Sequence, residues 1–289
     1  MLDSTKSPKP KIAVCLSGQL RTWKIAGPNI KRFFGPDVDY FIHSWTESAE
    51  RTSIGTHSVD YGVTHDADEI NEVVKFFQPT RCQFEPILQQ EGFVTGRWVN
   101  LFYSLDKSMK LKQQFEKEKR FKYDIVVKCR FDLAFHPAFT FSALLNMGRN
   151  WEIEPQAAKY VFSSIVNQLP NEGFANQIDD CFFYTSSPVA DYVSHNAYLE
   201  ALQTCADVNL RKNPLAQTRD YGPGAILFKS LSEAGCAPRV IEISNNGAAE
   251  RITGAWFCIV RATANQPPQI SNIQEYAKTV SEHFKYYES

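Results

Sequence analysis

Residues 123–133 read Tyr-Asp-Ile-Val-Val-Lys-Cys-Arg-Phe-Asp-Leu, an apolar run that turns polar at its carboxyl end. Continuous apolar runs are typical of strands that are buried on both faces of a parallel sheet. In open α/β sheets, ligands bind in the crevice beyond the carboxyl ends of the strands. Arg130 and Asp132, which share one face of an extended segment, are therefore candidate binding residues. A salt-bridged strand end without any chemistry is the alternative interpretation.

A strand near the amino terminus also ends in polar residues. Residues 12–16, Ile-Ala-Val-Cys-Leu, predict a short buried strand, and Ser17, Gly18 and Arg21 lie in the turn that follows. Free backbone N–H groups in a Ser-Gly turn, together with a guanidinium group, suit a phosphate. The turn lacks the glycine patterns of nucleoside triphosphatase and dinucleotide-binding loops. A plain strand-to-helix turn is the alternative interpretation.

A short helix is predicted over residues 28–34. A second strand is predicted over residues 38–43, and its polar end continues through His43 to Trp45. Residues 46–65 are rich in Ser, Thr, Gly and His without a clear period, which predicts a long surface loop. Apolar residues at three- and four-residue spacings predict a helix over residues 66–77, and a short strand follows it.

The clearest helical pattern covers residues 99–121. Its apolar residues mark a buried side, whereas Lys112 and Glu116 belong to a mixed-charge side that we expect to face solvent. A purely structural helix is the simplest interpretation of most of this segment. The polar residues of its first turns are expected to face a ligand at the sheet edge: Asn100, Tyr103 and Ser104.

Two adjacent carboxylates stand out in the second half of the chain. Residues 178–184 predict a strand that begins with Asp179 and Asp180. Neighbouring side chains of a strand point to opposite faces, so we expect one carboxylate to enter the cleft while the other caps or pairs. Further elements are predicted as strands over 160–162, 240–243 and 256–260 and as helices over 191–205, 221–235 and 273–286.

Composition is that of an ordinary folded protein. The 289 residues are 43% hydrophobic and 22% charged, and the net charge of −1 gives no attraction to nucleic acid or anionic membranes. The seven cysteines form no Cys-x-x-Cys pair and are expected to be reduced core residues. We expect a cytoplasmic protein without a membrane span, in which a flexible tail (1–10) precedes one domain (11–289).

Four segments, at residues 11–22, 40–45, 123–133 and 178–184, together resemble the GT-A-like glycosyltransferases of bacterial surface-polysaccharide clusters and large DNA viruses. The resemblance extends over roughly residues 11–235. It implies an α/β fold with a Rossmann-type mixed sheet flanked by helices in a single globular domain. It also implies a nucleotide-sugar-binding half, 11–135, and an acceptor-binding half, 136–289.

The activity implied by the resemblance is transfer of a hexose or pentose from a nucleotide-diphosphate donor to a glycan acceptor, in polysaccharide biosynthesis and with inversion. A non-catalytic carbohydrate- or nucleotide-binding protein of the same fold is the alternative. The residues expected to contact the nucleotide sugar are Ser17, Gly18, Arg21, Trp45, Asn100, Tyr103, Ser104, Arg130, Asp132 and Tyr221.

Related enzymes commonly bind a divalent metal through an Asp-x-Asp turn, which here reads Arg130-Phe131-Asp132. Two alternatives follow from this departure. Either Arg130 and Arg21 neutralise the diphosphate directly, or Asp132 holds Mg²⁺ or Mn²⁺ together with phosphate oxygens and water. Inversion also requires a general base, for which Asp180 is the first candidate, Asp179 the second and His43 the third.

Overall fold

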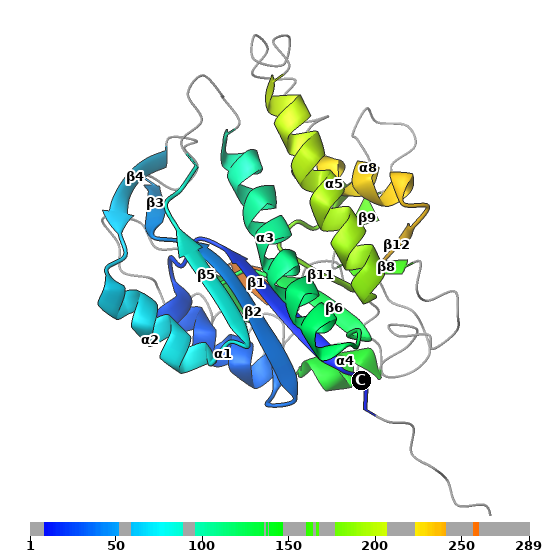
Figure 1. Ribbon diagram of the computed structural model, residues 1–289, viewed down its shortest axis with the longest axis horizontal. Helices are drawn as coiled ribbons and strands as arrows, with labels where there is room; N and C mark the ends of the chain where they lie inside the picture. Colours follow the sequence, from blue (N-terminus) through cyan, green and yellow to red (C-terminus); the bar gives the residue numbers. More distant parts are fainter. Residues whose placement is uncertain are drawn as a thin grey trace, which may run out of the picture.

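The computed structural model describes residues 9–51, 59–88, 96–135, 137, 139–146, 160–163, 166–167, 177–206, 223–240 and 257–259. Its centre is a seven-stranded mixed sheet with helices on both faces (Figure 1). This architecture confirms the predicted α/β class and is consistent with a GT-A-like fold.

The sheet joins strands from both halves of the chain. Its order is β12 (Ala237–Val240), β8 (Tyr160–Ser163), β11 (Phe182–Thr185), β6 (Ile125–Cys129), β1 (Ile12–Gly18), β2 (Val38–Trp45), β5 (Arg81–Glu85). Neighbouring strands are parallel except that β11 runs antiparallel to both β6 and β8. The amino end of β11 therefore meets the carboxyl ends of β6, β1, β2 and β5 at one edge.

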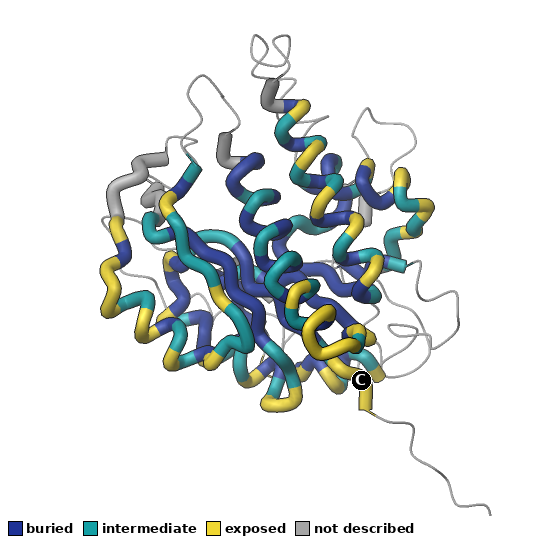
Figure 2. The backbone as a smooth tube through the Cα atoms, viewed as in Figure 1, coloured by how far each residue is buried: buried dark blue, intermediate teal, exposed yellow. Residues whose placement is uncertain are grey.

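Alternating side chains of β1 bury two separate cores. Val14 and Leu16 pack with the buried sides of α1 (Trp23–Phe34), α2 (Ala67–Phe77) and α4 (Phe141–Leu145). Ala13 and Cys15 pack with α3 (Gly96–Lys119), α5 (Ser187–Ala206) and α8 (Pro223–Glu233). The strands are buried along most of their length, and exposed residues gather on the outer sides of the helices (Figure 2). Burial on both faces explains the continuous apolar runs in the sequence.

Three small two-stranded sheets accompany the central one in the described part of the chain. The segment predicted as a long surface loop, 46–65, instead contains a hairpin of β3 (Glu47–Arg51) and β4 (Val59–Thr64). That prediction was wrong because the sequence lacks alternation and the pairing is irregular, with a register shift between Ser48 and Glu50. The remaining pairs are β7 (Leu133–Phe135) with β13 (Phe257–Ile259) and β9 (Val166–Asn167) with β10 (Gln177–Ile178).

Two predicted strands are interrupted by turns. The strand predicted over residues 123–133 ends at Cys129, so Arg130 and Asp132 lie in the turn between β6 and β7. The strand predicted over residues 178–184 consists of β10, a turn at 179–181 and β11. Sequence reasoning placed both pairs of charged residues in strands because no glycine or proline marks these turns.

Helix α1 begins earlier than the sequence predicts. The helix predicted from the sequence covers residues 28–34 and begins at Pro28. In the structure, α1 begins at Trp23 and contains Pro28. Its buried side, which includes Trp23, Ala26, Ile30 and Phe33, continues across the proline at three- and four-residue spacings. The terminal helix predicted over 273–286 lies outside the described residues.

Lys112 and Glu116 do not face solvent, contrary to the sequence prediction, and are 0% and 1% exposed. Lys112 Nζ lies 3.2 Å from Glu116 Oε2 and 2.7 Å from Asp191 Oδ1 on α5. Ser187 donates a hydrogen bond of 2.6 Å to Glu116 Oε1, and Lys122 Nζ lies 2.7 Å from Glu116 Oε2. Each buried charge is paired, and the cluster joins α3 to α5.

We predict that Glu116→Ala lowers the free energy of unfolding by about 3–5 kcal/mol, because it leaves the buried Lys112 without one of its partners. Urea unfolding followed by circular dichroism measures the change. Glu72→Ala, which breaks the exposed Lys24–Glu72 pair, is the matched control and should keep the wild-type midpoint. Equal midpoints for both variants would contradict a stabilising role of the buried cluster.

Candidate active site

A buried ion pair follows the carboxyl end of β6. Arg130 donates from Nε to Asp132 Oδ1 at 2.8 Å and from Nη2 to Oδ2 at 2.5 Å. Arg21, in the turn after β1, places Nη1 3.5 Å from Asp132 Oδ2. Burial would raise the pKa of Asp132, but the charges of Arg130 and Arg21 outweigh it and hold that pKa below its usual value. Asp132 is therefore ionised and orients both guanidinium groups.

Lys128 fixes the turn that faces this ion pair. Its side chain is 1% exposed, and its ammonium group donates to the carbonyl oxygens of Asp180 and Cys181, the latter at 3.0 Å. Antiparallel pairing of Phe182 with Cys129 brings the turn to the end of β6. Arg130 Nη1 lies 3.4 Å from Cys181 Sγ. Sequence reasoning had no ground for selecting Lys128, since a lysine inside an apolar strand has no visible partner.

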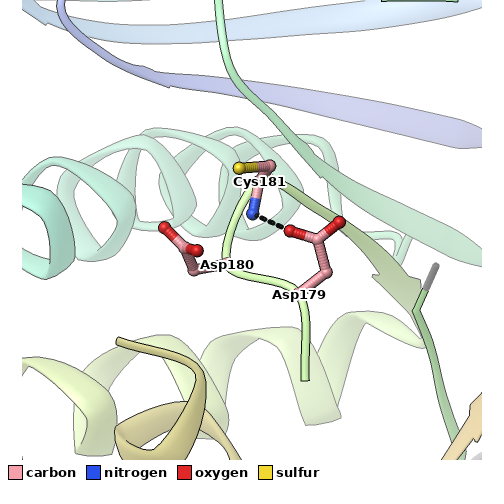
Figure 3. Close-up of side chains that lie close together, drawn as sticks. All are labelled: Asp179, Asp180 and Cys181. Carbon is pink, nitrogen blue, oxygen red and sulfur yellow. Dashed lines mark hydrogen bonds between the residues drawn. The ribbon is translucent and has the colours of Figure 1, made fainter. Parts of the chain in front are cut away.

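The carboxylates of Asp179 and Asp180 have different surroundings. Asp179 accepts a hydrogen bond of 2.7 Å from the backbone N–H of Cys181, and its own N–H donates to Ser163 Oγ at 3.0 Å. Figure 3 shows the Asp180 carboxylate on the other side of the turn. Both residues are partly exposed. Asp179 thus closes the turn through its hydrogen bond from the Cys181 N–H. The Asp180 carboxylate takes no part in that hydrogen bond.

A second polar group lies at the ends of β1, β2 and β5. His43 Nδ1 is 2.9 Å from Ser104 Oγ on α3, and His43 Nε2 is 2.9 Å from Glu85 Oε1. Ser104 Oγ also accepts a hydrogen bond of 2.8 Å from the N–H of Gly18. The Gly18 N–H is consequently engaged with Ser104, whereas the sequence analysis expected free N–H groups at this turn. Glu85 was not selected from the sequence, although it is the last residue of β5.

His43 is neutral in this arrangement. Burial lowers its pKa, and the hydrogen bond and charge of Glu85 only partly oppose that effect. The His43 side chain is 0% exposed, and both ring nitrogens contact protein groups. A buried imidazole with two protein partners is poorly placed to remove a proton from a substrate.

Aromatic side chains continue this group outward. Trp45 is 1% exposed and stacks on Tyr103 with ring centroids 5.6 Å apart and an interplanar angle of 21°. Tyr103 is partly exposed and makes an edge-to-face contact with Tyr198, with ring centroids 5.5 Å apart. Lys107 Nζ lies 5.0 Å from the Tyr103 ring centroid. Trp45 is therefore the buried ring of this stacked pair, and Tyr103 is the more accessible one.

Two buried polar atoms of the expected donor site have no hydrogen-bond partner in the described part of the chain, Ser17 Oγ and Asn100 Oδ1. The Asn100 amide nitrogen donates to the carbonyl of Leu88 at 3.2 Å, which fixes the orientation of the amide. The remaining expected contact, Tyr221, lies outside the described residues. The structure thus brings Arg21, Arg130 and Asp132 into one cluster and Gly18, His43 and Ser104 into another.

The described residues at this sheet edge do not fit a divalent metal. Both oxygens of Asp132 accept from Arg130, and the carboxylate is 2% exposed. Asp179, Asp180 and Cys181 have ligand atoms within 4.8 Å of one another. However, burial raises the pKa of the Cys181 thiol to about 12, and the cations Lys128 and Arg130 lie beside it. Positive charge next to these groups favours an anion over a second cation.

Comparisons with known proteins establish no family. No protein-family model and no curated protein matches the chain. A solved structure described as a glycosyltransferase involved in the glycosylation of the major capsid of PBCV-1 aligns with 93% of this chain and 100% of that chain. The sequence identity is 11% and the TM-score 0.37, values too low to support an inference about activity.

None of the helices in the described part of the chain combines the length and the apolar character needed to cross a bilayer.

We predict that the pKa of His43 lies below that of an ordinary histidine, because burial disfavours its charged form. A folded-state pKa below the unfolded value means that the neutral ring contributes stability above the unfolded pKa. That contribution is lost as the pH falls through the folded pKa. The difference in unfolding free energy between wild type and His43→Gln should therefore narrow between about pH 7 and about pH 5. NMR titration of the His43 ring gives its pKa directly, and a midpoint above that of a histidine in a short unstructured peptide would contradict the assignment.

Proposed function

We propose that the chain is a glycosyltransferase that moves a sugar from a nucleotide-diphosphate donor to a glycan acceptor with inversion. The observation that carries the proposal is the pair of guanidinium groups, Arg21 and Arg130, oriented by Asp132 at the same sheet edge as Asp180. Two fixed cations suit a diphosphate, and a nearby carboxylate suits an attacking hydroxyl group. Crevices at this edge are where α/β sheets bind ligands.

Arg21 and Arg130 would bind the diphosphate and stabilise it as it leaves. A guanidinium group has five N–H donors, and Arg130 uses one each from Nε, Nη1 and Nη2 toward Asp132 and Cys181. Its exposed fraction of 19% and that of Arg21, 30%, leave both accessible from the sheet edge. Negative charge grows on the leaving diphosphate in the transition state, so preorganised cations lower the barrier.

Asp180 would act as the general base. The acceptor hydroxyl oxygen attacks the anomeric carbon from the face opposite the diphosphate, while its proton passes to the Asp180 carboxylate. The bond between the anomeric carbon and the diphosphate oxygen breaks, and its electron pair leaves with the nucleotide. The half-exposed position of Asp180 supports this role over the buried His43. Asp179 would position Asp180 through the turn that it closes.

We predict that Arg21→Ala weakens donor binding about 10- to 100-fold, the value of one or two charge-assisted hydrogen bonds. Calorimetric titration with UDP-, GDP-, CMP- and dTDP-linked sugars measures it. Arg21 is partly exposed, so this variant avoids the buried charge that Arg130→Ala would leave. Lys24→Ala, which changes an exposed cation on the neighbouring helix, is the control. Failure of wild type to bind any nucleotide sugar would refute the donor site.

We predict that Asp180→Asn lowers the transfer rate about 10²- to 10⁴-fold with donor affinity unchanged, as expected for loss of a general base. Asp179→Asn is the matched variant, because an amide oxygen can still accept from the Cys181 N–H and close the turn. Transfer of radiolabelled sugar to a glycan library measures both. Donor binding without transfer or hydrolysis in wild type would instead support the non-catalytic binding protein.

We predict that donor binding and transfer persist in excess EDTA, because the arginines take the place of a metal. Titration with and without Mn²⁺ checks this expectation. An affinity that rises strongly with Mn²⁺ would overturn the assignment of diphosphate neutralisation to Arg21 and Arg130.

A further inference from the structure

We propose that Glu85, His43 and Ser104 form a hydrogen-bond relay that fixes Gly18 and, through the turn after β1, the guanidinium group of Arg21. His43 and Ser104 are then positioning residues for the donor diphosphate and do not touch it. The identity of the ligand rests on the proposed function, whereas the relay itself rests on the contacts below.

Burial of the His43 ring selects one proton arrangement of the relay at neutral pH. Glu85 is ionised, so His43 Nε2, 2.9 Å from it, carries a proton. The ring is neutral, so Nδ1 is an acceptor. Ser104 Oγ lies 2.9 Å from Nδ1 and 3.1 Å from the His43 carbonyl oxygen, and we assign its single hydroxyl proton to the closer acceptor, Nδ1. Ser104 Oγ in turn accepts the Gly18 N–H at 2.8 Å. Every polar hydrogen from Gly18 to Glu85 then has an acceptor.

Ionisation of Glu85 follows from its partners. Burial would raise the pKa of this carboxyl group, but hydrogen bonds from His43 and Tyr103 outweigh it, and the pKa is lowered. Gln83 Nε2 donates to the second oxygen, Glu85 Oε2, at 2.9 Å. The relay therefore starts from a carboxylate that is itself held in place on β5.

Hydrogen bonds, and not packing, determine the position of Gly18. Its φ of +110° lies in a region that side chains rarely adopt, and a Cβ at this position would meet no atom of the described residues within 4 Å. The Gly18 carbonyl accepts from Ser44 Oγ at 2.7 Å, and its N–H is held by Ser104. Together with the register pairing of Gly18 with Ser44 of β2, these two bonds hold the end of β1, where the turn begins.

The turn transmits this position to the cation cluster. Arg21, three residues after Gly18, also has a positive φ, 41°, and reaches Asp132 from this conformation. A shift of the turn would move its guanidinium group away from Asp132 and from a diphosphate. Small displacements of binding groups are costly because charge-assisted hydrogen bonds depend on geometry.

Nucleophilic catalysis by Ser104 is the competing interpretation, since a serine, a histidine and a carboxylate lie in hydrogen-bonding order. Ser104 and His43 are both 0% exposed, and Ser104 Oγ already accepts a backbone N–H. A substrate carbonyl would have no access to this hydroxyl group. Burial thus favours the positioning role.

The first test needs no ligand. In protein labelled uniformly with ¹⁵N, we expect the His43 ring to be protonated at Nε2 and to accept a hydrogen bond at Nδ1. Ser104→Ala should shift the Nδ1 resonance and the Gly18 amide resonance and speed hydrogen exchange at Gly18. An Nδ1-protonated ring in wild type, or a Gly18 amide that Ser104→Ala leaves unchanged, would overturn the relay.

The second test measures anion binding with inorganic pyrophosphate as the probe. Ser104→Ala and Glu85→Ala should each weaken binding about 10-fold, the effect of losing one well-placed hydrogen bond. Glu85→Gln keeps an oxygen acceptor for Nε2–H, so it should recover most of the loss seen in Glu85→Ala. With a donor sugar, the same variants should raise KM more than they lower kcat.

The outcomes separate the relay from the proposed function. Glu85→Gln binding as weakly as Glu85→Ala, or unchanged affinity in Ser104→Ala, would overturn the positioning role while leaving the transferase proposal intact. The wild-type protein could instead show the Nε2-protonated His43 ring and yet bind neither pyrophosphate nor a nucleotide sugar. That result would overturn the donor site and, with it, the positioning of a diphosphate.

Discussion

The ion pair of Arg130 and Asp132 is the constraint on which the functional edge of this protein depends. A carboxylate exposed by only 2% is stable as an ion only if cations compensate for its lost hydration. Arg130 supplies a two-point contact, and Arg21 adds a second cation from another strand end. The pair therefore ties the turn after β1 to the turn after β6. The same contacts surround Asp132 with positive charge, which disfavours a metal cation beside it.

The direction of β11 brings the carboxylates of Asp179 and Asp180 to this edge. In a wholly parallel sheet, the amino ends of strands lie opposite the carboxyl ends, so the residues before a strand would be far from Arg130. Because β11 is antiparallel to β6, the turn at 179–181 lies beside the end of β6. Lys128 strengthens this placement from within the sheet, since its ammonium group is bound by the carbonyl groups of the turn. The cation cluster and the Asp180 carboxylate thus lie at the same edge of the sheet.

Neutral and charged hydrogen bonds together hold these turns. Buried ionic contacts orient Arg130, whereas the turn after β1 is held by the Ser104 hydroxyl group and the neutral His43. The backbone conformation of Gly18 is one that glycine adopts readily and other residues rarely, and the surrounding hydrogen bonds select it. The edge is consequently preorganised, which would limit the cost of binding the diphosphate that we propose as its ligand.

Apolar periodicity in the sequence was enough to predict the α/β class, the buried strands β1, β2 and β6, the helices α2 and α3, and the polar residues at the strand ends. Periodicity is a local property, so it could not show that Lys112 is buried. The partners Ser187 and Asp191 belong to a helix distant in the chain, with Ser187 separated from Lys112 by 75 positions. Nor could periodicity select Glu85 or Lys128, whose roles depend on β2 and β11 lying beside them. Only the tertiary structure decided which charges are paired. A charged side chain is expected to be exposed to solvent unless the fold places a partner of opposite charge beside it.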